Sequence, residues 1–189
     1  MNRASLSPRQ KALAVASVAL GLLAVAADDS KQTIDAKGMK FQAPQSWKLS
    51  PPSKLTRRAE LKVDPLEGDR YPAELIVFAF AGGAGTVEAN IKRWQDQFRD
   101  KDGNVPPVES KTVKGKNTDV TRVETSGTYR PANFGGPAEP ERPDARMFVA
   151  IVATPDLSYY IKMVGPNKTM SKLRTDFDAL LASIQVEDK

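Results

Sequence analysis

The chain has 189 residues, of which 40% are hydrophobic and 27% are charged, with a formal net charge of +5. This length and composition suit one globular domain and exclude a wholly disordered chain. Cysteine and histidine are both absent, which excludes disulfides, thiolate nucleophiles and every catalytic triad with a histidine base. A carboxylate-based site is the chemistry that this composition leaves open.

The N-terminal segment, residues 1–27, has the three-part layout of a secretory signal peptide. It begins with basic and no acidic residues, continues with a small and apolar run over residues 12–24, and ends in small residues that fit a cleavage site. We expect an exported protein, periplasmic or secreted, with no stable membrane span after cleavage. The alternative is a retained anchor, although the apolar run is shorter than the roughly 20 residues that cross a bilayer.

Removal of this leader changes the charge of the protein. The full chain has 28 basic and 23 acidic residues, and the leader holds Arg3, Arg9 and Lys11, so the mature chain has 25 basic and 23 acidic residues. A nearly neutral domain lacks the basic face that nucleic acids require, so we expect no nucleic-acid binding.

The first half of the mature chain reads as strands separated by turns. Residues 28–37 are polar and predict a flexible lead-in. Alternating apolar residues over 39–43 predict a short strand, followed by a turn that tucks Trp47 inward. Alternation over residues 55–64 predicts a strand with one solvent face, and the apolar run 75–81 predicts a central strand that is buried on both faces.

Residues 86–98 predict a helix, because their apolar side chains recur at helical spacing. This stripe consists of Val87, Ile91, Trp94 and Phe98. Its position on the stripe makes Trp94 a core residue in this interpretation rather than a stacking platform for a ligand.

The second half predicts four strands and a helix. Residues 108–129 read as a hairpin that turns at residues 115–117. Residues 130–146 hold four prolines and two glycines, which predicts a long loop rather than an inner strand. Two apolar strands follow, and Asn167 is placed to cap a final helix.

The expected order along the chain is β-β-β-α-β-β-β-β-α. Strands that follow one another through short links favour an antiparallel β-sheet flanked by helices, an α+β protein with an α/β/α sandwich. We expect a single globular domain over residues 38–186.

Gly83-Ala84-Gly85 lies between a predicted strand and a predicted helix, where phosphate-binding loops occur. Glu88 stands where a dinucleotide fingerprint has its third glycine, and no lysine follows as a Walker loop requires. Glu88 in the first helical turn would also repel a phosphate. We therefore predict a sharp turn and no nucleotide cofactor.

The loop over residues 130–146 is the preferred interaction element. It brings aromatic and arginine side chains of the kinds that enrich interface centres, and its prolines lower the entropy lost on binding. The candidate binding residues are Tyr129, Arg130, Phe134, Arg142 and Arg146. The alternative is a mobile, solvated insertion.

Two other charged features of the sequence have a functional and a structural interpretation. Lys54, Arg57, Arg58 and Lys62 form a basic run that could meet an anionic partner, but we favour the interpretation as the solvated face of a strand. Acidic pairs occur at chain ends and in loops, and we predict that they are solvated and bind no metal. These pairs are Asp28 and Asp29, Asp64 and Glu67, Asp100 and Asp102, and Glu139 and Glu141.

Four segments together resemble the PsbP-like fold, in particular its small exported bacterial members. They are FQAPQSW (41–47), AELIVFAF (73–80), YYIKMVGPNKT (159–169) and FDALLASIQ (177–185). The resemblance covers residues 38–185 and implies an α/β/α sandwich used as a binding or accessory module. Members of the family include an extrinsic subunit of photosystem II and a factor that binds a small GTPase. The family has no catalytic motif, so the resemblance implies no catalytic residue.

We therefore expect an exported, non-catalytic binding or accessory domain of the bacterial cell envelope, without a cofactor, whose partner is an envelope protein or another ligand. The alternative is an envelope hydrolase or small-ligand-binding protein that uses loop carboxylates. A water-excluded cleft with convergent carboxylates would favour the alternative, and an exposed apolar loop surface would favour the accessory domain.

Overall fold

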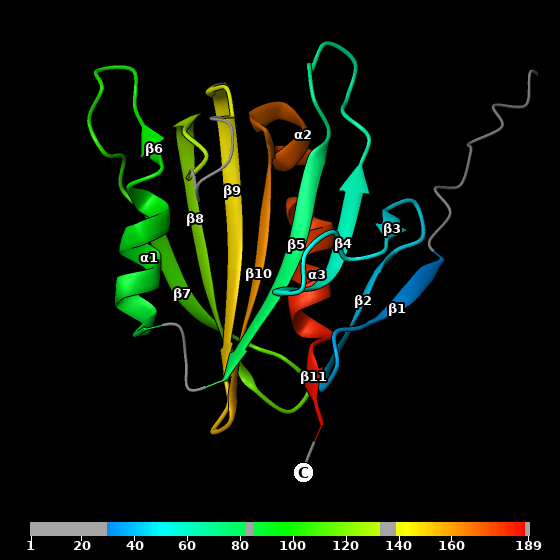
Figure 1. Cartoon of the computed structure of the whole chain (residues 1–189). Helices are drawn as coiled ribbons and strands as arrows, with labels where there is room; N and C mark the ends of the chain where they lie inside the picture. Colours follow the sequence, from blue (N-terminus) through cyan, green and yellow to red (C-terminus); the bar gives the residue numbers. More distant parts are fainter. Residues whose placement is uncertain (1–29, 82–84, 133–138, 188–189) are drawn as a thin grey trace, which may run out of the picture.

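The computed structural model describes residues 30–81, 85–132 and 139–187. These ranges form two antiparallel sheets and three helices (Figure 1). The larger sheet consists of β3 (Lys48–Ser50), β4 (Arg57–Val63), β5 (Ala73–Ala81), β6 (Phe98–Arg99), β7 (Glu109–Lys114), β8 (Asp119–Tyr129), β9 (Arg142–Ala153) and β10 (Leu157–Pro166). The smaller sheet consists of β1 (Lys31–Asp35), β2 (Met39–Pro44) and β11 (Gln185–Val186). The helices are α1 (Val87–Gln95), α2 (Asn167–Lys172) and α3 (Arg174–Ala182).

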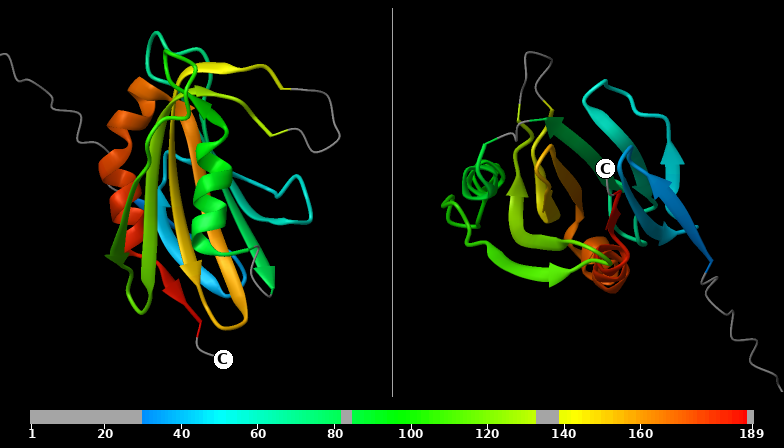
Figure 2. Two further views of the ribbon diagram at one scale, coloured as in Figure 1. Left: turned by 90° about the vertical axis from the view of Figure 1, so that its left-hand side faces the viewer. Right: turned by 90° about the horizontal axis from the view of Figure 1, so that it is seen from below.

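The strands of the larger sheet run in the order β3-β4-β5-β10-β9-β8-β6, and β7 also pairs with β8. The sheet separates α1 from α2 and α3, which lie on its opposite faces (Figure 2). One core lies under α3 and the smaller sheet and includes Trp47, Phe148 and Phe177. A second core lies under α1 and includes Trp94 and Phe98. The expected fold class, an antiparallel sheet flanked by helices, is confirmed.

Several local predictions are also confirmed. Strands β7 and β8 form the expected hairpin, with Lys114 opposite Asp119 at its turn. Helix α1 lies within the predicted range, and the hydroxyl of Thr86 accepts a hydrogen bond from the backbone N–H of Ala89 at 3.2 Å. Trp47 is buried with 1% of its surface exposed, as expected for a side chain tucked under the sheet.

The predicted strand order is incomplete, because several short strands were not predicted. In the described residues five strands precede α1 rather than three, and residues 31–35 of the expected flexible lead-in form β1. Strand β1 pairs with β2 and buries Ile34. Strands β6 and β11 have two residues each. Segments of this length carry no readable periodicity, so only their pairing partners reveal them.

The proposed loop over residues 130–146 is shorter than predicted, because β9 begins at Arg142. Proline was expected to exclude a strand here, yet Pro143 lies inside one. The pairing of β8 with β9 is irregular at this point, and Asp144 has a φ of 48°. A bulge leaves residues outside the regular ladder, so the missing N–H of proline costs no strand hydrogen bond.

Two further expectations are corrected near the larger sheet. Strand β5 is central, but only one of its faces is fully buried, and Glu74, Ile76 and Phe78 on the other face are partly exposed. The final helix is divided into α2 and α3, and Asn167 does not cap it. The side-chain oxygen of Asn167 instead accepts a hydrogen bond from Nε of Arg146 at 2.7 Å.

No helix in the described ranges is long and apolar enough to cross a membrane. The leader and the residues 82–84 of the glycine turn lie outside these ranges. Gly85 is described and has a φ of 93°, a left-handed conformation that suits glycine at the start of α1.

Gly127 provides a test of the close approach between β8 and β6. It has a φ of 149°, and a Cβ atom there would overlap the carbonyl oxygen of Arg99. We expect Gly127→Ala to lower the unfolding free energy by roughly 1–2 kcal/mol more than Gly68→Ala. Gly68 is the matched control, because its φ is also positive, at 89°, but no atom lies near the added methyl group. Urea denaturation measures both losses, and equal losses would contradict the expectation.

Candidate binding cleft

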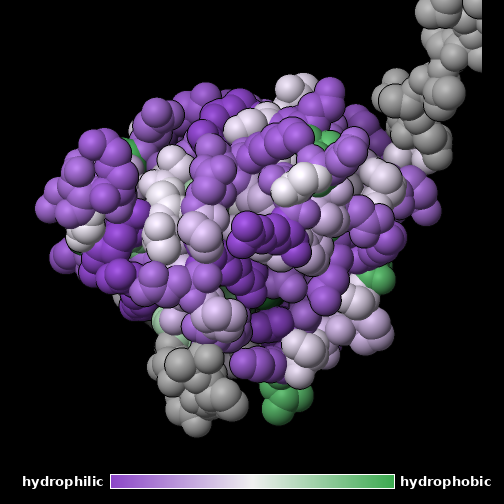
Figure 3. All heavy atoms as spheres, turned by 90° about the horizontal axis from the view of Figure 1, so that it is seen from above, coloured by the Kyte–Doolittle hydropathy of each residue, from purple (hydrophilic) through white to green (hydrophobic). Residues whose placement is uncertain are grey.

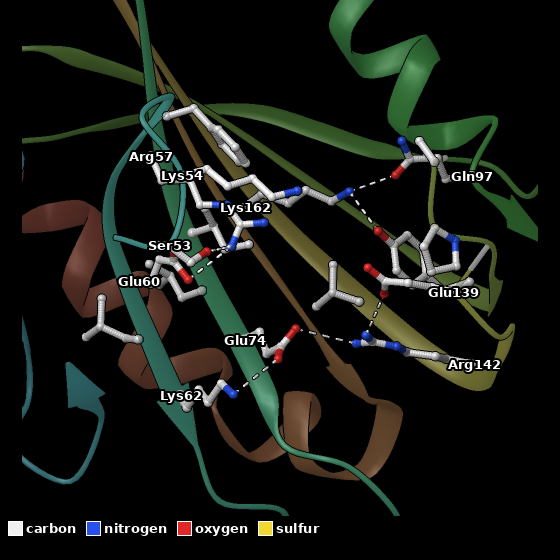
Figure 4. Close-up of a pocket in the computed structure, with 18 residues that line it drawn as sticks. Ser53, Lys54, Arg57, Glu60, Lys62, Glu74, Gln97, Glu139, Arg142 and Lys162 are labelled. Atoms are coloured by element: carbon white, nitrogen blue, oxygen red, sulfur yellow. Dashed lines mark hydrogen bonds and ion pairs between the residues drawn. The ribbon is translucent and has the colours of Figure 1, made fainter. Parts of the chain in front are cut away.

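Helix α1 leaves part of its sheet face open. The buried residues of the core that includes Trp94 come mainly from β8, β9 and β10. Over β4, β5 and the end of β10 lies a cleft of about 480 Å³ (Figure 4). One side of the cleft is bordered by Ser53, Lys54 and Arg57, and the other by Tyr129, Pro131, Ala132, Glu139 and Arg142. The polar and aromatic lining residues include Lys54, Arg57, Glu60, Lys62, Glu74, Phe78, Gln97, Tyr129, Glu139, Arg142 and Lys162.

Strand pairing sets the floor of this cleft. Glu60 on β4 lies opposite Ile76 on β5, which lies opposite Lys162 on β10. In the neighbouring row, Lys62 lies opposite Glu74. Directly opposite residues of adjacent strands point to the same face, so these side chains share the cleft although they are far apart in the sequence.

Each carboxylate of the cleft has a basic partner. Arg57 contacts Glu60 at 3.0 Å, and Arg142 contacts Glu139 at 3.1 Å and Glu74 at 3.6 Å. Burial by itself would raise the pKa of Glu60, but hydrogen bonds from the backbone N–H of Ser53 and from Arg57 outweigh it, so this pKa is lowered. Each carboxylate of the cleft is therefore paired with one of the cleft's own cations.

Lys162 is the exception among the cations on the floor. Its Nζ donates a hydrogen bond to Oε1 of Gln97 at 2.7 Å (Figure 4). It donates a second hydrogen bond to the hydroxyl of Tyr129 at 3.2 Å. It lies 5.0 Å from the centre of the Tyr129 ring. No carboxylate of the described residues forms an ion pair with it. Burial, with a smaller repulsion from Arg142, lowers the pKa of Lys162 to about 7.

Tyr129 is held beside Lys162 by the sheet and the second core. It lies opposite Arg142 in the β8–β9 pair, and its ring packs against Phe98 with the centroids 5.1 Å apart. Burial, with Glu139 and Glu74 adding to it and Arg142 opposing it, raises the pKa of Tyr129 to about 12. The hydroxyl therefore keeps its proton near neutral pH and remains a hydrogen-bond donor.

The structure describes four of the five predicted binding residues and separates them. Tyr129 and Arg142 come together in the cleft, while Arg130 forms an exposed ion pair with Glu141 at 2.7 Å. Phe134 lies outside the described residues. The placement of Arg146 with them is corrected, because its guanidinium contacts the buried Glu124 and does not line the cleft.

Sequence reasoning missed Lys162 and Gln97. Lys162 does carry a signal, since it is the single charged residue in the apolar run of β10. The basic run was interpreted as a solvated strand face, but Lys54, Arg57 and Lys62 of this run line the cleft.

Arg146 belongs to a charge cluster under α3. Glu124 has a side chain that is 5% exposed, and it accepts hydrogen bonds from Arg122 at 3.0 Å, from Arg146 and from Arg174. Burial favours the neutral form of Glu124, but these arginine hydrogen bonds outweigh it and lower its pKa. Arg122 also donates to Asp178 on α3 at 2.7 Å. The cluster thus fastens α3 to β8 and β9.

The loop carboxylates serve local structure. Asp64 pairs with Lys48 at 2.6 Å, and Oδ1 of Asp100 accepts hydrogen bonds from the backbone N–H groups of Asp102 and Asn104. In the part of the chain that the structure describes, no three or more acidic side chains are grouped so that they could hold a metal ion.

The sandwich and its connections define a PsbP-like fold. Among solved structures, the chain is similar to cyanobacterial PsbP (CyanoP) from Synechocystis, with 14% identity over 89% of this chain and 99% of that chain, at a TM-score of 0.52. It is also similar to LpqN of Mycobacterium tuberculosis, with 10% identity over 84% of this chain and 91% of that chain, at a TM-score of 0.50. LpqN is described as involved in cell envelope biogenesis.

A Bacteroides thetaiotaomicron protein matches with 12% identity over 85% of this chain, at a TM-score of 0.47. The chain spans 50% of that protein's length. No family model and no curated protein matches the chain. At these identities the similarities to CyanoP and LpqN establish the fold alone.

Proposed function

We propose that this protein is an exported, non-catalytic binding domain of the bacterial cell envelope, and that its ligand site is the cleft beside α1. The observation that carries the proposal is the open part of the sheet face, with about 480 Å³ of space lined by charged and aromatic side chains. Small-molecule sites typically occupy about 300–1,000 Å³ and contain a few convergent polar groups.

The charge pattern of the cleft supports binding rather than catalysis. A carboxylate that acts as a general acid needs a raised pKa, whereas the pKa of Glu60 is lowered and Glu74 and Glu139 both contact Arg142. This arrangement makes Glu60 unsuited to act as a general acid and supports a binding role for the cleft.

The outer surface also supports a polar site. From above, the molecule is mostly hydrophilic, with small and separate hydrophobic areas (Figure 3). The exposed large hydrophobic side chains of the described residues lie apart on different segments; they are Leu49, Leu55, Leu66 and Val105. Extended apolar patches mark many protein interfaces, so the cleft is the better candidate for recognition.

The envelope location rests on the leader and on the fold. Residues 1–27 have the pattern of a secretory signal, and LpqN, which has a similar fold, is described as involved in cell envelope biogenesis. Both observations support an accessory protein that works outside the cytoplasm.

Capture from the envelope tests this function. Tagged protein from residue 28 onward is incubated with an envelope extract of the producing cell at low and high salt, and mass spectrometry identifies retained proteins and small molecules. We expect Tyr129→Ala with Arg142→Ala to reduce retention at least about tenfold, because both side chains line the cleft. The matched control is Lys114→Ala on β7, whose exposed side chain pairs with Asp119 far from this lining.

Two results would contradict the proposal. Equal retention by the wild type and the cleft variant would exclude the cleft as the binding site. Failure of the wild type to retain anything, together with an unchanged melting temperature in the extract, would argue against a binding domain altogether.

A further inference from the structure

The donors around Lys162 converge on one place in the cleft. The ammonium has three hydrogens, and it donates to Gln97 and to Tyr129, which leaves one hydrogen for another acceptor. The hydroxyl oxygen of Tyr129 accepts from Lys162, so its own hydrogen is still to be donated. The oxygen of Gln97 is likewise used, which leaves its amide N–H groups as donors.

This local charge is unbalanced within the described part of the molecule. The two partners of Lys162 are neutral, and placing an ammonium in a partly buried site without a counter-charge is unfavourable. The lowered pKa, about 7, is consistent with this cost. A buried charge that destabilises its own fold and faces a cleft is typical of a functional site.

We propose that the cleft binds a small ligand through an oxyanion, a carboxylate or a phosphate, that accepts hydrogen bonds from Lys162 and Tyr129. The inference rests on the proposed function, because it names the chemistry recognised at the same cleft. Charge-assisted hydrogen bonds are about twice as strong as neutral ones. Ile76, Phe78 and Val164 offer an apolar wall for the remainder of the ligand.

The other charged groups of the cleft leave this subsite positive. They are Lys54 before β4, Arg57, Glu60 and Lys62 on β4, Glu74 on β5, Glu139 before β9, and Arg142 on β9. The three carboxylates are engaged by their own basic partners, and Arg142 adds repulsion to the Lys162 ammonium. A bound oxyanion supplies the missing negative charge and raises the pKa of Lys162, so its affinity decreases as the pH rises above about 7.

Titration of lysine-labelled protein tests the subsite. The chain from residue 28 onward is labelled with ¹³C-lysine, and the Cε resonance of Lys162 is assigned by its loss in Lys162→Met. Sodium acetate and inorganic phosphate are added in separate arms at constant ionic strength, with chloride as the reference. We expect a saturable shift of this resonance in at least one arm, and the arm with the lower midpoint distinguishes a carboxylate from a phosphate ligand.

Variants link the shift to the named donors. Calorimetry with the better probe is expected to show binding that is at least about tenfold weaker in Lys162→Met and several-fold weaker in Tyr129→Phe. Lys114→Met is the matched control and should bind as the wild type does. Tyr129→Phe keeps the ring, so a retained melting temperature shows that the loss is not a folding defect.

The proposal is overturned if neither probe moves the Lys162 resonance relative to chloride, or if Lys162→Met and Lys114→Met bind the probe equally. Capture of an envelope ligand that Tyr129→Ala with Arg142→Ala abolishes, but Lys162→Met leaves intact, would refute the oxyanion subsite and retain the binding function. Saturable anion binding at Lys162 without any captured envelope ligand would support the oxyanion subsite and contradict the proposed binding of an envelope ligand.

Discussion

Glu124→Gln is expected to lower the unfolding free energy by about 3–5 kcal/mol, because it removes one partner of a buried charge cluster. Glu124 receives hydrogen bonds from three arginines on β8, β9 and α3, and the side chain of Arg122 is only 4% exposed. Glutamine has nearly the same shape, but it leaves these guanidinium groups with less negative charge around them. Urea denaturation followed by circular dichroism at neutral pH measures the loss.

The decrease of the unfolding free energy at acidic pH provides a second measurement of the contribution of Glu124. Its folded pKa is lowered, so the unfolded chain takes up the proton first as the pH falls. The stabilisation is present above the unfolded pKa and is lost as the pH falls through the folded pKa. In Glu124→Gln this contribution to acid sensitivity should disappear.

Asp64→Asn is the matched control for this experiment. It removes a carboxylate from an exposed pair with Lys48, in which the two side chains are 71% and 65% exposed. Such pairs contribute about 1 kcal/mol or less. If Glu124→Gln and Asp64→Asn have equal effects, the cluster does not fasten α3 to the sheet.

As the pH rises from about 7 to about 9, the free energy of unfolding of the wild type is expected to increase by about 2 kcal/mol because of Lys162. The folded pKa is about 7 and the ordinary value is 10.5, so the unfolded chain binds the extra proton in this window. Stability therefore rises with pH here. The chain has no histidine or cysteine, whose ordinary pKa values lie nearest this window.

Urea denaturation at several pH values compares Lys162→Met with the wild type and with Lys114→Met. We expect the rise to vanish in Lys162→Met and to persist in Lys114→Met, whose side chain is 81% exposed. The window ends below pH 10, because Tyr129, with a pKa of about 12, contributes an opposite slope above the ordinary tyrosine value, about 10. Parallel curves for all three proteins would show that the pKa of Lys162 is not lowered in the folded state.

Local patterns predicted much of the fold. The stripe of Val87, Ile91 and Trp94 predicted α1, and the alternation in residues 108–129 predicted the β7–β8 hairpin. Such patterns succeed because one side of a helix or strand faces a core along its whole length. Strands of two residues, such as β6, have no such pattern and form only because a neighbour offers free backbone groups.

The candidate site was predictable only in part. Tyr129 and Arg142 were selected for their residue types, and both line the cleft. Arg146 was selected for the same reason, but strand geometry directs it to the other face, where it contacts Glu124. The distinction depends on which side of β9 each residue faces after a bulge, and one extra residue in a strand reverses that side.

The sequence by itself determined an antiparallel α+β protein with a helix after its central strand, and it excluded cysteine and histidine chemistry. These properties follow from composition and from contacts between near neighbours. Only the tertiary structure decided that Lys162 shares a cleft with Gln97 and Tyr129, which lie 65 and 33 residues before it. Strand register and the limited cover by α1 bring them together, and both depend on packing between distant segments of the chain.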